Sequence, residues 1–111
     1  MKMYILIKDT VPLGLAMAAI GHGVLACYLA YQADSDMQVW LKESYKKVVC
    51  KVNEKKFENA KLYAKSVVMT ESVLDNKETA IVFCPRPDAD WPKPFNFYQL
   101  YSRTVMSITG S

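Results

Sequence analysis

The sequence predicts a single layered α/β domain with a mixed four-stranded sheet flanked by helices. Short runs rich in β-branched residues alternate with longer segments of helical periodicity, as expected of strands and helices that pack in layers. The last two strand-like runs lie close together in the sequence, which predicts an antiparallel hairpin within the sheet. A chain of 111 residues is long enough for one domain with a sizeable core.

The first strand and the first helix come from the N-terminal third. Residues 3–7 are apolar and β-prone, and they predict a buried strand. Residues 12–31 carry no formally charged side chain, and a run of that length could span a bilayer. Its three glycines, its histidine and the lack of a flanking basic cluster favour a core helix of a soluble protein over residues 14–32. We therefore expect no membrane segment.

A shorter helix, a strand and a third helix follow. Residues 33–36 break the first helix and supply N-cap side chains for the second. One face of the second helix is expected to pack on the sheet: Met37, Trp40, Leu41 and Ser44. Residues 46–52 alternate as a strand does, and Asn53 can cap a helix over residues 54–65. The inward stripe of that helix consists of Phe57, Ala60 and Ala64.

The C-terminal third predicts a hairpin and then an extended segment. Residues 67–73 and 79–84 are β-branched runs, and a turn over residues 74–78 joins them. Four of the five prolines lie in residues 85–94, and aromatic residues follow. Proline-rich backbone tends to be extended, and aromatic side chains can fix it to the surface of the domain.

The charge of the chain is unevenly distributed. The net charge is +3, and residues 42–65 carry eight lysines against three glutamates. Such a segment can attract phosphates, although lysines interleaved with glutamates more often form an ordinary solvated face. The order of the residues leaves both interpretations open.

The cysteines and the missing motifs narrow the chemistry. Cys27, Cys50 and Cys84 lie in apolar stretches without CxxC spacing, which indicates reduced core residues of a cytosolic protein. With one histidine and scattered acids, the chain lacks the ligand cluster of a zinc site. It also lacks a P-loop, a GxGxxG motif and a GxSxG motif. We therefore expect neither a metal nor a cofactor.

The only histidine, His22, is the clearest candidate for chemistry. Helical spacing places four apolar residues on or near its face: Leu15, Ala19, Ala26 and Leu29. A lone histidine on such a face is more often a packed core residue than a catalyst, so the core interpretation is favoured. Gly21 and Gly23 each cost about 1 kcal/mol relative to alanine in a helix. A strand, a second subunit or a ligand is therefore expected to approach closely there.

The order and spacing of several short segments resemble a known family. The first strand leads to a loop that ends in Gly14, and an alanine-rich helix carries a histidine eight residues later. Trp40 stands seven residues before a Lys-Val-Val-Cys run, and the third helix ends in Ala-Lys. A Thr-Ala-Ile-Val-Phe-Cys-Pro run follows at residues 79–85. In this order, the segments resemble the class II peptidyl-tRNA hydrolase family.

The resemblance covers residues 2 to about 101, where Leu-Tyr matches the usual ending of the family. It implies a domain over residues 1–101 with the fold of that family, followed by a tail over residues 102–111. It also implies tRNA as a partner, and we expect a cytoplasmic protein that forms a homodimer.

If the chain is an enzyme, the resemblance implies cleavage of the ester that links a peptide or an amino acid to the 3′ end of tRNA. His22 would act as a general base or orient the attacking water, and Glu71 or Asp75 would position it. Three lysines would hold phosphates of the substrate: Lys47, Lys51 and Lys55.

The chain departs from the family beside the histidine. The family has a lysine just after the glycine and a glutamine ahead of the histidine, where this chain has Leu15 and Ala19. A hydrolase without that lysine lacks a cation able to stabilise charge that develops on the ester. The alternative function is therefore a catalytically lapsed module that binds a protein or a small apolar ligand. A purely structural homodimer subunit is the third possibility.

Overall fold

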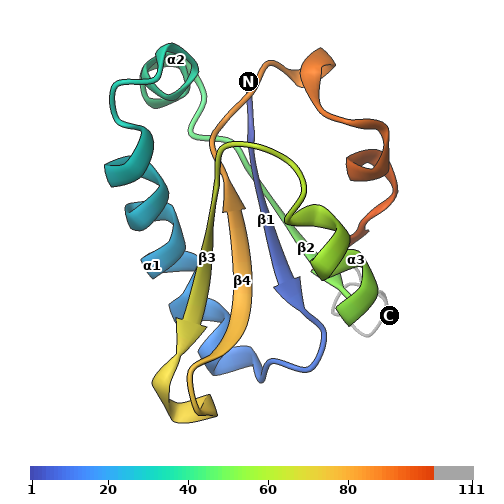
Figure 1. The fold of residues 1–111 in the computed structure, drawn as a ribbon. Helices are drawn as coiled ribbons and strands as arrows, with labels where there is room; N and C mark the ends of the chain where they lie inside the picture. Colours follow the sequence, from blue (N-terminus) through green and yellow to red (C-terminus); the bar gives the residue numbers. More distant parts are fainter. Residues whose placement is uncertain (102–111) are drawn as a thin grey trace, which may run out of the picture.

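The computed structural model describes residues 1–101 and shows a five-stranded sheet with a helical layer on each face (Figure 1). The elements are β1 (Met3–Lys8), α1 (Leu13–Tyr31), α2 (Ser35–Glu43), β2 (Lys47–Val52), α3 (Glu54–Ala60), β3 (Ser66–Glu71), β4 (Lys77–Phe83) and β5 (Gln99–Leu100). Three 3₁₀ turns join them: η1 (Ser72–Leu74), η2 (Asp88–Asp90) and η3 (Lys93–Phe97). The predicted α/β class is confirmed.

The sheet is mixed and has the strand order β3-β4-β1-β2-β5. β1 runs parallel to β2 and antiparallel to β4, and β3 and β4 form the predicted hairpin. The predicted number of four strands is too small, because Gln99 and Leu100 pair with Lys51 and Cys50 at the edge of β2 and form β5. A strand of two residues is too short to show an alternating pattern in the sequence.

The first core lies between α1 and the sheet. One side of α1 faces the sheet, with four buried residues: Ala16, Ala19, Gly23 and Cys27. Against them lie inward residues of β1 and β4: Met3, Ile5, Ile7, Ala80 and Val82. Met37 and Trp40 of α2 belong to the same core, as predicted. The term α1 layer is used below for α1, α2 and this core.

The second core lies on the opposite face of the sheet, under α3 and residues 85–98. Phe95 is 2% exposed there, and its ring centroid lies 5.0 Å from that of Tyr4 and 5.1 Å from that of Phe83. Phe57 of α3 is fully buried in the same cluster. Aromatic side chains thus fix the proline-rich segment, as predicted, although the segment also forms η2 and η3. The term α3 layer is used below for this half.

The predicted caps of α2 and α3 are confirmed. The carboxylate of Asp34 accepts hydrogen bonds from the N–H groups of Asp36 at 2.9 Å and Met37 at 3.4 Å. The side-chain oxygen of Asn53 accepts a hydrogen bond from the Lys56 N–H at 2.9 Å. These contacts satisfy N–H groups that the first turn of a helix leaves without an intrahelical partner.

α3 ends at Ala60 and is five residues shorter than predicted. The predicted inward stripe is right for Phe57 and Ala60, which are fully buried, but wrong for Ala64, which is exposed. Lys65 has a left-handed backbone with φ of 60° and leads the chain into β3. Outside the helix, the Ala64 carbonyl accepts a hydrogen bond from the Arg86 guanidinium at 2.8 Å, so a tertiary contact satisfies this polar group.

α1 lies within one residue of its predicted bounds. It is long and apolar enough to cross a membrane by length and composition alone. One side of it nevertheless packs on β3 and β4 (Figure 1). At Gly23, an added Cβ would come within 2.5 Å of a Val82 methyl group, so the predicted close approach of a strand is confirmed there. α1 thus forms one layer of the domain.

Candidate functional site

His22 lies on the exposed side of α1, so the prediction of a packed core histidine is wrong. α1 turns a side centred near Gly23 toward the sheet, and His22 is about 100° around the helix from that residue. Within residues 1–101 the imidazole has no hydrogen bond, ion pair or ring contact. It is free to contact water or a ligand, and a neutral imidazole can both accept and donate a proton.

The residues that flank His22 offer it no polar group. Ala19 is only 7% exposed, and Leu15 is half-buried against the first core. On the other side of α1, Ile20 and Val49 line a groove toward β2. Ile20 is about 200° around the helix from His22. His22 therefore lies away from β2, on the side of α1 nearer the β3 edge.

Of the two predicted carboxylates, Glu71 lies in the same layer as His22. It ends β3 two residues after Met69, which packs against the first core, so both belong to the α1 side of the sheet. Its carboxylate accepts a hydrogen bond from the Val73 N–H at 3.2 Å. Asp75 is exposed, with a left-handed φ of 56° in the turn that follows. Neither carboxylate is within ion-pair distance of His22.

The three predicted phosphate-binding lysines belong to different layers. Lys47, Val49 and Lys51 are every second residue of β2, so they share one face of the strand. Val49 packs on the first core, so this is the α1 face of the sheet. Each ammonium lies over an aromatic ring, with Nζ 5.2 Å and 4.9 Å from the ring centroid. Lys55 is exposed on α3, on the opposite face. The structure brings Lys47 and Lys51 together on one strand, but neither Lys55 nor His22 joins them.

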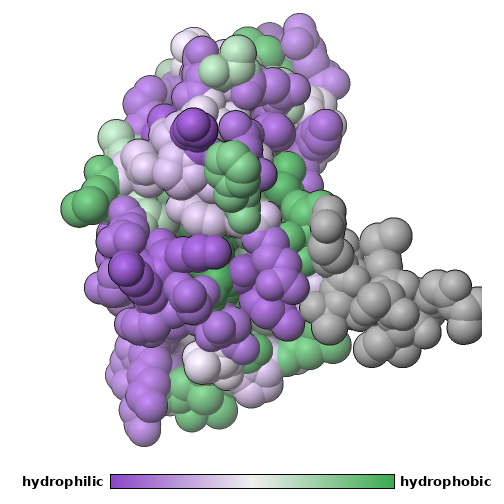
Figure 2. All heavy atoms as spheres, turned by 90° about the vertical axis from the view of Figure 1, so that its right-hand side faces the viewer, coloured by the Kyte–Doolittle hydropathy of each residue, from purple (hydrophilic) through white to green (hydrophobic). Residues whose placement is uncertain are grey.

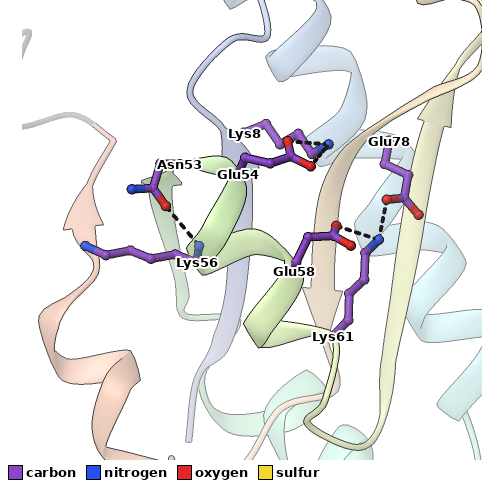
Figure 3. Close-up of polar contacts among 7 residues, drawn as sticks. All are labelled: Lys8, Asn53, Glu54, Lys56, Glu58, Lys61 and Glu78. Carbon is purple, nitrogen blue, oxygen red and sulfur yellow. Dashed lines mark hydrogen bonds and ion pairs between the residues drawn. The ribbon is translucent and has the colours of Figure 1, made fainter.

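Other lysines of the basic segment form ion pairs within the fold (Figure 3). Lys61 binds Glu58 at 2.8 Å and also contacts Glu78 of β4. Lys65 binds Asp34 at 2.7 Å, and this hydrogen bond holds the pKa of the Asp34 carboxyl below its usual range. The α3 side of the molecule is largely hydrophilic, with scattered hydrophobic patches (Figure 2). Part of the basic segment is thus an ordinary solvated face.

The cysteines are unsuited to nucleophilic chemistry. Cys27, Cys50 and Cys84 are free and buried, as predicted. Burial raises the pKa of Cys27 and Cys84 to about 12 and that of Cys50 to about 11. Thiolate is therefore scarce at neutral pH. Among the described residues, no three His, Cys, Asp or Glu side chains gather into a metal site.

The exposed side of α1 is the feature that the sequence reasoning missed. Four large apolar side chains on it are between 58% and 64% exposed: Leu13, Met17, Leu25 and Leu29. Hydropathy alone does not show which side of a uniformly apolar helix is buried. Residue size shows which side is buried, because the side that packs on the sheet carries small residues while the large ones face outward.

The fold and the site define a mixed-sheet α/β protein with a free histidine on its first helix. The chain matches the family model "Peptidyl-tRNA hydrolase PTH2" over residues 1–95, and it belongs to this family. The family recognised from the order and spacing of the segments is thus confirmed. A comparison with curated proteins gives no match.

Proposed function

We propose that the chain hydrolyses the ester that links a peptide or an amino acid to the 3′ end of tRNA, in the cytoplasm. The observation that carries the proposal is the free, exposed imidazole of His22 on a helix within the family match. The imidazole takes a proton from water as the water oxygen attacks the ester carbonyl. The bond from the carbonyl carbon to the ribose oxygen then breaks, and the ribose oxygen receives a proton.

Glu71 is the better candidate for positioning His22. α1 runs antiparallel to β3, with Gly23 beside Met69. Glu71 is two residues beyond Met69, about 7 Å along the strand. This places it a little over one helical turn from the level of Gly23, toward the N-terminus of α1. A carboxylate at that distance can reach the imidazole through a bridging water. Asp75 lies beyond the end of β3 and is therefore further from this level.

The lysines are proposed to bind the tRNA backbone rather than the ester. Lys47 and Lys51 have no carboxylate partner within residues 1–101 and belong to the far side of α1 from His22. The molecule measures 37 Å along two axes, so a substrate as long as tRNA can contact both sides at once. Phosphate contacts of this kind fix the orientation of the substrate. Lys55, on the opposite layer, would bind a more distant phosphate.

Hydrolysis of peptidyl-tRNA by the purified full chain tests the proposal. His22→Ala is expected to lower kcat by about 100-fold or more. Lys47→Ala and Lys51→Ala are expected to raise KM with little effect on kcat. Lys42→Ala, an exposed charge on α2, is the matched control for lost charge. Absence of turnover by the natural chain, or full activity of His22→Ala, would contradict the proposal.

The second candidate is a catalytically lapsed module that binds a protein or a small apolar ligand. The observation that favours it is the apolar surroundings of His22, where Leu15 and Ala19 supply no charge. Loss of one group that stabilises the developing oxyanion costs about 10²- to 10³-fold in kcat. Activity that appears only in Leu15→Lys would support this candidate. Tight, salt-sensitive binding of tRNA by the natural chain would argue against it.

A further inference from the structure

A groove in the α3 layer lies between α3 and the 3₁₀ turn η3. Its volume is about 550 Å³, within the range of about 300 to 1,000 Å³ that is usual for ligand pockets. Three aromatic side chains line it: Tyr63, Phe97 and Tyr98. The groove is on the opposite face of the sheet from α1 and His22, so the proposed ester site does not account for it.

The three rings of the groove differ in how the fold holds them. The rings of Tyr63 and Tyr98 pack edge to face against Phe95, with centroids 5.3 Å and 5.2 Å apart. Phe97 is 71% exposed and has no ring contact within residues 1–101. The groove therefore presents one flat apolar surface to water, beside two rings that the core fixes in place. Unpaired nucleic-acid bases stack on aromatic surfaces of this kind.

Asn59 adds a polar group that suits the edge of a base. Its side-chain amide can both donate and accept hydrogen bonds, and unpaired bases are recognised by hydrogen bonds to their edges. Asn59 lines the groove and is exposed, and its amide has no hydrogen bond within residues 1–101. A peptide can use the same amide, so the charge around the groove decides between the two classes of ligand.

Three exposed lysines border the groove, and the fold neutralises none of them. They are Lys55 and Lys56 in the first turn of α3 and Lys93 at the start of η3. None has a carboxylate partner within residues 1–101. The Lys56 side chain lines the groove and extends from α3 away from the ion pairs of Lys61 (Figure 3). Cations beside aromatic rings are the combination by which proteins hold the backbone and the bases of a single strand.

The acids of α3 do not offset this positive charge. Glu54 binds Lys8 at 3.0 Å, and Glu58 binds Lys61 at 2.8 Å. The charge left free around the groove is therefore positive, which favours a polyanion over a neutral apolar or proline-rich peptide. Among polyanions, a single-stranded nucleic acid also offers flat bases for the rings.

We propose that this groove binds single-stranded RNA, with a base stacked on Phe97 and phosphates beside Lys56 and Lys93. The choice of RNA over DNA rests on the proposed function, whose substrate is an RNA. The site reads an unpaired base, whereas Lys47 and Lys51 on the other face offer phosphate contacts alone. Binding at this groove does not require ester cleavage.

Fluorescence anisotropy of the full chain with a labelled single-stranded RNA of about ten nucleotides tests the site. The natural chain is expected to bind this RNA in the micromolar range at about 50 mM salt. A duplex of the same length is expected to bind at least about fivefold more weakly, because its bases are stacked inside the double helix. Equal affinity for the single strand and the duplex would overturn the proposal.

Phe97→Ala tests the stacking platform. It is expected to raise the dissociation constant of the single strand at least about fivefold, whereas Phe97→Tyr keeps a ring and is expected to bind as the natural chain does. Val73→Ala is the matched control, because Val73 is 72% exposed in another 3₁₀ turn, η1, and its loss is expected to leave binding unchanged. Far-UV circular dichroism checks that all three variants are folded.

Lys56→Ala tests the phosphate contact. It is expected to weaken binding and to lower the slope of log Kd against log salt concentration by about one. Lys42→Ala on α2 is again the control for lost charge and is expected to change neither quantity. Joint replacement of Lys47 and Lys51 by alanine is expected to leave binding of the short single strand unchanged, because both lie on the other face.

Three further results would overturn the proposal. The first is binding of the single strand that depends on Lys47 and Lys51 but not on Phe97. The second is a proline-rich peptide, and not RNA, that shifts the amide NMR signals of Asn59 and Tyr63. The third is a dimer that Phe97→Ala dissociates, since a second copy would then occupy the groove. RNA binding and ester cleavage are separate measurements, so this site and the proposed hydrolase can fail independently.

Discussion

The two helical layers lie on opposite faces of the sheet and differ in the side chains that they turn toward solvent. In the α3 layer, aromatic residues fill the core and the outward side carries charges, such as the Lys8 and Glu54 pair at 3.0 Å. In the α1 layer, small residues face the sheet and large apolar residues face outward. Apolar side chains favour folding only when their surface is removed from water. The outward side of α1 therefore needs an explanation beyond the folded monomer, which association or ligand binding would supply.

The largest expected effect tests whether the α3 layer is the main source of stability. Phe95 lies at the centre of that layer, with five aromatic neighbours whose ring centroids are 5.0 to 5.3 Å away: Tyr4, Tyr63, Phe83, Trp91 and Tyr98. Phe95→Ala is expected to lower the free energy of unfolding by about 3 to 5 kcal/mol, since it leaves a large cavity. Urea unfolding of the natural chain and Phe95→Ala measures this loss of free energy.

Phe97→Ala is the matched control, because the Phe97 side chain is 71% exposed in the same 3₁₀ turn. It is expected to change the free energy of unfolding by less than about 0.5 kcal/mol. Equal losses in the two variants would show that the layer is not organised around Phe95.

The second prediction tests the close contact between α1 and the sheet. Gly23→Ala places a Cβ 2.5 Å from Val82 and 3.3 Å from Met69, so the side chains or the helix must move. The expected loss is about 1 to 3 kcal/mol, as is usual for overpacking. Thermal unfolding of the natural chain and the variant measures this loss.

Gly14→Ala is the control for helix propensity, because nothing lies within 4 Å of an added Cβ there. It is expected to leave stability unchanged or slightly raised. A Gly23→Ala variant as stable as Gly14→Ala would mean that α1 can slide away from β4 at little cost.

Local patterns predicted most of the fold, and tertiary contacts account for the errors. The caps at Asp34 and Asn53 depend on side chains within three residues of their partners, so the sequence shows them directly. The segment after α3 turns at Lys65, with φ of 60°, and its Ala64 carbonyl binds Arg86, which is distant in sequence, so local patterns do not show this path. β5 likewise exists because a distant strand offers a free edge, and two residues carry no signal of it.

The sequence predicts that His22 lies on the first helix, but it does not predict what surrounds the imidazole. A histidine on the first helix follows from spacing, yet its exposure depends on which side of α1 meets the sheet. Periodicity could not decide this, because the helix is apolar on every side. The separation of Lys55 from Lys47 and Lys51 depends in turn on the crossing of the chain from one face of the sheet to the other after β2.

The third prediction concerns the polar contacts that hold the end of the α1 layer. Asp34 caps α2 and binds Lys65 ahead of β3. Asp34→Ala is expected to cost about 1 kcal/mol at pH 7, the usual value of an N-cap. Asp34→Asn keeps a capping oxygen and is expected to cost less. Urea unfolding of both variants separates the cap from the ion pair.

The pH dependence gives the sign of the ion-pair effect. The hydrogen bond from Lys65, followed by those from the backbone of Asp36 and Met37, holds the pKa of the Asp34 carboxyl below its ordinary value. Its contribution is therefore present above the unfolded pKa of about 3.9 and is lost as pH falls through the lowered native value. The difference in stability between the natural chain and Asp34→Asn is expected to shrink as the pH falls from the unfolded pKa of Asp34 to its lowered native pKa. A difference that grows on acidification would contradict the assignment.

The smallest expected effect bears most directly on the contrast between the layers. His22 is exposed and has no side-chain partner within residues 1–101, so His22→Ala is expected to change the stability of the monomer by less than about 0.5 kcal/mol. A histidine packed in the core would leave a cavity and an unpaired polar group, and its loss would cost about 1 to 3 kcal/mol. Dilute urea unfolding of the natural chain and His22→Ala distinguishes the two. A large loss of stability would show that His22 is packed in the core, and it would contradict a free imidazole on the outward side of α1. A negligible loss would mean that folding does not depend on His22, so the imidazole remains available for chemistry.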